Sequence, residues 1–121
     1  MPADQIAVLY PQIMEQKLCR AGYNPMTSRK WLDIVGWLNL PAARHYCVDW
    51  GLEQMAKSLD RLIWVDDVVL AHRHWKRSPD GIPQDDLYRR NEGYAKEDTR
   101  IVHASNAIYA EKVELLREAM Q

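Results

Sequence analysis

The sequence lacks phenylalanine, any long apolar run and a strong excess of charge of one sign. Its 16 Lys and Arg against 17 Asp and Glu give a net charge of −1. That balance argues against a strongly basic nucleic-acid binder and against an acidic mimic of DNA. No run approaches the ~20 apolar residues of a membrane span, and the N-terminus does not have the pattern of a signal peptide. We therefore expect a cytoplasmic protein without a membrane span.

Cysteine is also scarce, and the spacing of Cys19 and Cys47 fits neither a zinc site nor a redox motif. Both lie among apolar residues, which predicts buried free thiols in a reducing compartment. A Ser-His-Asp pattern and a glycine-rich phosphate loop are missing as well. The chain is instead rich in aromatic residues with a polar group, 5 Trp and 6 Tyr, which suit contact with sugars or a protein partner.

The length of 121 residues predicts a single domain, residues 1–121, with its own core. Short apolar runs predict strands at 6–10, ended by Pro11, at 61–65 and at 68–74, with Asp66-Asp67 between the last two and a short extended segment at 45–48. Helices are predicted at 12–22, from a cap at Thr27 or Ser28 to Leu40-Pro41, from Asp49 to 59, and beyond Asp85.

This order of elements predicts an α/β or α+β fold in which helices flank a small sheet of three or four strands. A polar stretch with Pro79, Gly81 and Pro83 predicts a mobile loop. The last segment predicts one long helix packed against the sheet or a partner, because its apolar residues form one stripe. Those residues are Ile101, Val102, Ile108, Tyr109, Leu116 and Met120.

Three groups of polar residues are candidates for chemistry. Asp49 stands where an extended segment meets a helix, so it is either a general base at the mouth of the sheet or a plain helix cap. His72 and His74 share one face of a predicted strand, where they either bind a divalent metal with a nearby carboxylate or face solvent. The third group, residues 85–92, has acidic residues before basic ones, as at an ordinary helix start.

Residues 23 to about 100 resemble the C-terminal half of inverting glycosyltransferases with the A-type fold, especially short family-2-like transferases found in phages. The resemblance rests on four blocks in the same order and spacing. They are Thr27–Leu38, His45–Leu52, Arg61–His74 and Asp85–Tyr88. By this resemblance Asp49 is the catalytic base, and His72 or His74 completes a site for Mn²⁺ or Mg²⁺.

The resemblance also implies a surface that binds the acceptor or a partner. Trp31, Trp37 and Trp50 are expected to border the acceptor pocket, where aromatic rings stack on sugars. Trp75, in the basic segment after His74, and Asp85, Asp86 and Tyr88 of the last block are the further residues expected to contact an acceptor or partner.

The chain departs from the family at the features that hold the sugar nucleotide. It contains no Asp-x-Asp, it has Val48 where a Glu usually precedes the base, and the nucleotide-binding half is missing. Without a metal on the leaving diphosphate, transfer loses several kcal/mol of transition-state stabilisation. We therefore expect this chain alone to be inactive as a transferase and to need no cofactor, with Mn²⁺ or Mg²⁺ required only in an active transferase.

Two functions follow from this comparison. The first is a non-catalytic, transferase-derived protein that acts by binding a protein or by self-association, for example as a phage-encoded regulator or inhibitor of a host protein. The alternative is half of a split glycosyltransferase, or a minimal one, that uses a sugar nucleotide with Asp49 as general base. A nucleic-acid module built on 72–77 is a third hypothesis, against which the net charge argues.

Overall fold

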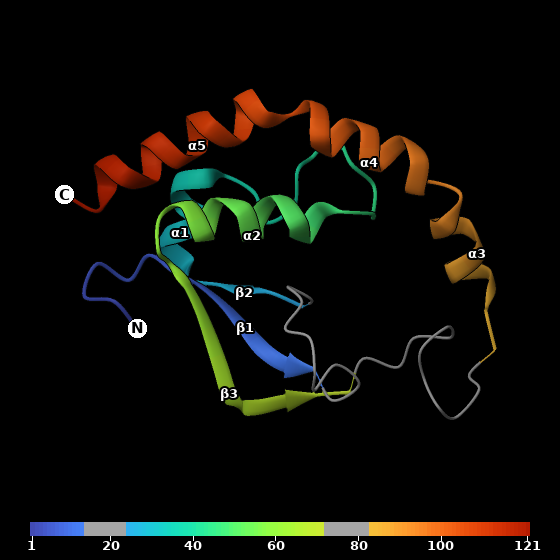
Figure 1. Cartoon of the computed structure of the whole chain (residues 1–121), viewed down its shortest axis with the longest axis horizontal. Helices are drawn as coiled ribbons and strands as arrows, with labels where there is room; N and C mark the ends of the chain where they lie inside the picture. Colours follow the sequence, from blue (N-terminus) through green and yellow to red (C-terminus); the bar gives the residue numbers. More distant parts are fainter. Residues whose placement is uncertain (14–23, 72–82) are drawn as a thin grey trace.

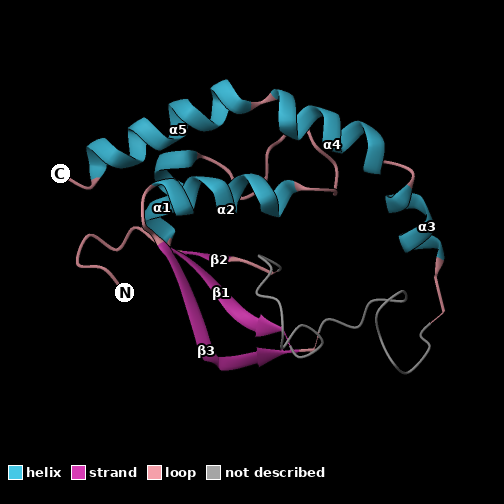
Figure 2. Ribbon diagram, viewed as in Figure 1, coloured by secondary structure: helices cyan, strands magenta, loops and turns pink. Residues whose placement is uncertain are grey.

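A computed structural model describes residues 1–13, 24–71 and 83–121. In these ranges the chain forms an α+β fold with a three-stranded mixed sheet and five helices (Figures 1 and 2). The elements are β1 (Val8–Ile13), β2 (Met26–Thr27), α1 (Arg29–Val35), α2 (Val48–Ser58), β3 (Leu62–Leu70), α3 (Asp86–Glu92), α4 (Ala95–Ala104) and α5 (Asn106–Ala119). The expected small sheet with flanking helices and a C-terminal helix is thus confirmed. No helix in the described ranges is long and apolar enough to cross a membrane.

The central strand is β1, which pairs antiparallel with β2 and parallel with β3. The prediction that Pro11 ends this strand is wrong, because β1 continues through Pro11 to Ile13. Pro11 lies opposite Val65, whereas Gln12 lies opposite Val69, so the register shifts at the proline. A residue without an N–H donor is tolerated at such a bulge, where the ladder of hydrogen bonds is already interrupted.

The same register shift explains why β3 is one continuous strand. Two strands separated by Asp66-Asp67 were expected, but one strand runs from Leu62 to Leu70. The register shift leaves residues 66–68 without opposite partners on β1, and β3 bends in its middle (Figure 1). A bulge of this kind lets two acidic residues remain within a strand, because it places them where pairing is not required.

Helix α1 begins where the sequence predicted and ends earlier. Ser28 is its cap, since the backbone N–H of Trp31 donates to Ser28 Oγ at 3.2 Å. The helix ends at Gly36, whose φ of 87° is a left-handed C-cap, and not at Leu40-Pro41. Trp31 and Val35 of this helix are buried, whereas Leu38 lies beyond the helix and is 39% exposed.

The C-terminal region differs from the single long helix that was predicted. It forms α3, α4 and α5, with a break at Ser105, whose hydroxyl donates to the carbonyl of Ile101 at 2.7 Å. Val102, Tyr109 and Leu116 are buried at seven-residue intervals, whereas Ile108 is 42% exposed. Helix α5 packs on α1 and α2, so the helices form two layers above the strands (Figure 1).

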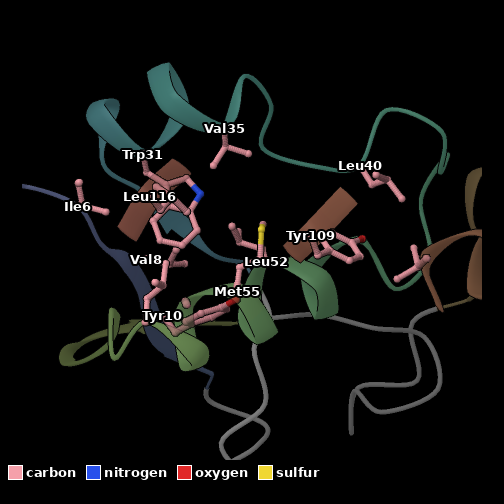
Figure 3. Close-up of a cluster of buried hydrophobic side chains, with 13 residues drawn as sticks. Ile6, Val8, Tyr10, Trp31, Val35, Leu40, Leu52, Met55, Tyr109 and Leu116 are labelled. Carbon is pink, nitrogen blue, oxygen red and sulfur yellow. The ribbon is translucent and has the colours of Figure 1, made fainter. Parts of the chain in front are cut away.

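The core lies between the sheet, α1, α2 and α5 (Figure 3). Val8 and Tyr10 of β1 meet Leu52 and Met55 of α2 there, and Leu116 of α5 closes the far side. Helices α2 and α5 approach closely at Gly51, where an added Cβ would stand 2.3 Å from Cζ and from the hydroxyl oxygen of Tyr109. The absence of a side chain at Gly51 therefore allows α5 to cover α2.

Candidate functional site

The candidate site lies at the start of α2. Helix α2 ends next to the start of β3. The start of β1 lies beside the same point, because the N–H of Val8 donates to the carbonyl of Arg61. The opposite end of α2 therefore lies toward the carboxyl ends of both parallel strands, as Figure 1 shows. Ligands of open α/β sheets bind outside the carboxyl ends of parallel strands. Asp49, in the first turn of α2, is the acidic residue that α2 places there.

Asp49 does not act as the cap of α2. The cap position belongs to Cys47, in a left-handed conformation with φ of 58° and no side-chain capping bond. Asp49 Oδ1 instead accepts the neighbouring N–H of Trp50 at 3.1 Å. Burial raises the pKa of the Asp49 carboxyl, and the N–H groups of Asp49 and Trp50 offset only part of that rise. A partly buried carboxylate with a raised pKa is suited to accept a proton.

Tyr10 lies beneath this end of α2, and the sequence had placed it only in the strand predicted at 6–10. Its side chain is fully buried, its ring packs on Trp64 at 5.4 Å, and its hydroxyl has no hydrogen-bond partner in the part of the chain that the structure describes. Burial raises the pKa of Tyr10, and the negative charges of Glu53 and Asp49 raise it further. The tyrosine hydroxyl thus lies within the field of two carboxylates of α2.

Glu53 is the second residue that sequence reasoning missed. It follows Asp49 by four positions, so the two carboxylates share one face of α2. Its charge raises the pKa of Asp49 further, and its own carboxylate pairs with Lys57 one turn later. The Asp-x-x-x-Glu spacing inside a predicted helix was the available signal.

The segment that leads into α2 is held by Asp98 of α4. A short extended strand at 45–48 was predicted, and this is wrong, because the segment forms turns that end at Cys47. Asp98 Oδ1 accepts the N–H of Arg44 at 3.0 Å, and Oδ2 accepts those of His45 at 2.8 Å and Tyr46 at 2.9 Å. Figure 1 shows this connection rising from α1 to the underside of α4 before it returns to α2.

The three tryptophans expected to border the acceptor have different positions. Trp31 has no exposed surface and belongs to the core, so the structure does not place it at the wall of a pocket. Trp37 packs edge-on against Tyr109 at 6.1 Å. Trp50, next to Asp49 in the chain, is partly exposed, and its ring packs against His103 of α4 with the ring centres 4.7 Å apart and the planes tilted by 53°. Of the three, Trp50 is the one beside the candidate base.

The acidic block before α3 has structural roles. Asp85 caps α3 by accepting the N–H of Tyr88 at 2.9 Å, and Asp86 pairs with Arg89. No residue of α3 is buried, and the helix lies apart from α2 in Figure 1. Asp85, Asp86 and Tyr88 therefore stay a predicted contact surface separate from the site at Asp49.

The predicted metal ligands His72 and His74, with Trp75, lie outside the described residues, as does Cys19. Within residues 1–13, 24–71 and 83–121, no group of three or more His, Cys, Asp and Glu could hold a metal ion. Cys47 is a free thiol, partly buried, with its sulfur 3.5 Å from Thr99 Oγ1.

No protein-family model, no curated protein and no solved structure matches this chain.

The stability of Asp49→Asn distinguishes a proton acceptor from a helix-stabilising residue. Burial raises the pKa of Asp49 above its unfolded value, so folding is disfavoured once pH rises above the unfolded pKa and the carboxylate ionises. We expect Asp49→Asn to raise the free energy of unfolding at pH 7 by up to about 1 kcal/mol, as is common at functional positions. Urea denaturation at pH 7 and at pH 3 measures this, and the gain should disappear at the lower pH. A loss of stability at pH 7 would show that Asp49 is a residue that stabilises helix α2.

Proposed function

We propose that this chain is the acceptor-activating half of a sugar transferase and that a second polypeptide supplies the sugar-nucleotide site. In this proposal Asp49 removes the proton from an acceptor hydroxyl while the hydroxyl oxygen attacks the anomeric carbon and the nucleoside diphosphate leaves. The observation that carries the proposal is the position of Asp49. It is partly buried, has a raised pKa and lies toward the carboxyl ends of the parallel strands β1 and β3.

Two further observations support this proposal. Burial raises the pKa of the Asp49 carboxyl and the negative charge of Glu53 raises it further, while the buried Tyr10 hydroxyl lies within the field of both carboxylates. Trp50 presents a partly exposed ring next to it, and aromatic rings suit the apolar faces of sugars. The resemblance of residues 23 to about 100 to the C-terminal half of inverting glycosyltransferases gives the reaction class. His72 and His74 remain the predicted ligands of Mn²⁺ or Mg²⁺.

Replacement of Asp49 tests the proposed reaction. The full chain is used as bait, and the polypeptide that co-purifies with it is assayed, with and without Mn²⁺, for transfer from radiolabelled UDP-, GDP- and dTDP-sugars. We expect transfer with the wild-type chain and a loss of about 100-fold or more with Asp49→Asn, the usual effect of removing a general base. Glu114→Gln is the matched control, because it removes an exposed carboxylate of α5 that pairs with Arg117 and should retain the activity. Full activity of the Asp49→Asn complex would contradict the proposal.

The exposed end of β3 favours a second candidate function, in which the chain binds a protein partner without catalysis. β3 lies at the edge of the sheet, and nothing in the described ranges pairs with its outer side. Its last residues Val68, Val69 and Leu70 are 38%, 48% and 39% exposed. Exposed apolar strand edges bind other strands, so this edge suits a partner that extends the sheet.

A charge on this edge tests the binding function. Val69→Glu should weaken association with the co-purified polypeptide, or self-association, by about tenfold or more, because it places a carboxylate in an apolar contact. Analytical ultracentrifugation measures association with the polypeptide as well as self-association. Ile108→Glu is the control, since Ile108 is comparably exposed, at 42%, but lies on α5. Equal effects of the two substitutions would show that the edge of β3 is not the binding surface.

A further inference from the structure

Asp98 makes the most extensive set of polar contacts of any buried side chain in the described residues. It is 1% exposed, and its two carboxylate oxygens accept three consecutive backbone N–H groups, from Arg44, His45 and Tyr46. These donors lie 52 to 54 residues before Asp98 in the sequence. A buried carboxylate without partners is very costly, whereas convergent N–H donors stabilise the ionised form.

The charge of Asp98 is retained at neutral pH. Burial raises its pKa, but the N–H groups of Arg44, Tyr46 and His45 outweigh this effect, so that the net pKa is lowered. The guanidinium of Arg44 also lowers the pKa of Asp98. It lies over the ring of Tyr94 at the start of α4, 4.7 Å from the ring centre. The segment 44–46 is therefore fixed to α4 by an anion that stays ionised.

The same segment continues directly into the candidate site. Cys47 follows Tyr46 with a φ of 58°, and its carbonyl accepts the N–H of Trp50 at 3.1 Å. α4 contacts this turn at two further points, since Thr99 contacts the sulfur of Cys47 and the His103 ring packs against Trp50. Asp49 stands between Cys47 and Trp50, so α4 holds the chain on both sides of it.

We propose that Asp98 is a positioning residue for Asp49. It fixes the turn 44–46, the turn fixes the start of α2, and the start of α2 keeps the Asp49 carboxylate partly buried above Tyr10. This inference rests on the proposed role of Asp49 as a base, and it assigns to α4 a part in the site that neither the spacing nor the resemblance indicated. The ionisable groups that interact with Asp49 in the described structure are Glu53, which raises the pKa of Asp49, His45, which lowers it, and Tyr10, whose own pKa Asp49 raises.

The pKa of Asp49 tests this role directly, without an assay of transfer. It is measured by NMR titration of the side-chain carboxyl carbon in ¹³C-labelled full-length chain. We expect Asp98→Asn and Asp98→Glu both to move the pKa of Asp49 down toward the ordinary value of about 3.9, because the freed turn exposes the carboxylate to water. Asp98→Glu keeps the charge and changes only the reach of the side chain, so it separates geometry from electrostatics.

Glu97→Gln is the matched control, since it removes a negative charge from the neighbouring exposed position of α4 and leaves the turn intact. An unchanged Asp49 pKa in both Asp98 variants would overturn the inference, as would a shift in Asp98→Asn no larger than that in Glu97→Gln. If near-UV circular dichroism shows that neither Asp98 variant folds, Asp98 supports the whole fold and the positioning role is also overturned. Failure of the proposed function appears separately, as retained transfer in Asp49→Asn.

Discussion

The interaction on which the site depends is the buried contact between the Asp98 carboxylate and the N–H groups of residues 44–46. It joins α4 to the connection between α1 and α2, two parts of the chain that are more than 50 residues apart. Because the carboxylate is buried, it must be matched by donors, and because the segment has no regular structure, its N–H groups must find an acceptor. The carboxylate and the three N–H groups thus supply each other's hydrogen-bond partners, and the start of α2 is fixed as a consequence.

The sheet determines where this start lies. Parallel pairing of β1 and β3 requires a long crossover between them, and α1 and α2 are the helices that the structure describes within it. A helix that returns from the carboxyl ends of the strands to their beginning must start near the carboxyl ends. Asp49 is in the first turn of that helix, so the topology places a carboxylate at the usual ligand-binding edge of a parallel sheet. Tyr10, on the central strand below, gives this edge a buried hydroxyl.

Local signals in the sequence predicted the elements better than their connections. The cap at Ser28 and the helix α2 were recognisable because caps and helical periodicity depend on neighbours a few residues away. Pro11 misled because a bulge on the partner strand, at residues 66–68, removes the need for its missing N–H. Asp49 could be found from its junction, whereas Tyr10 and Asp98 could not, since their roles depend on contacts between distant segments. Nothing in the local sequence of α4 distinguishes Asp98 from the exposed Glu97 beside it.

Amide hydrogen exchange of the wild-type chain tests the central claim most directly. If the Asp98 carboxylate holds the turn before α2, the amides of Arg44, His45 and Tyr46 must exchange as slowly as amides of the core helices, although they lie in no helix or strand. Two-dimensional NMR in D₂O at neutral pH, where Asp98 is ionised, resolves the three amides individually. Protection of all three, comparable with that of Leu52 and Met55 in α2, is the predicted result. Exchange at the rate of an unstructured peptide would contradict the account.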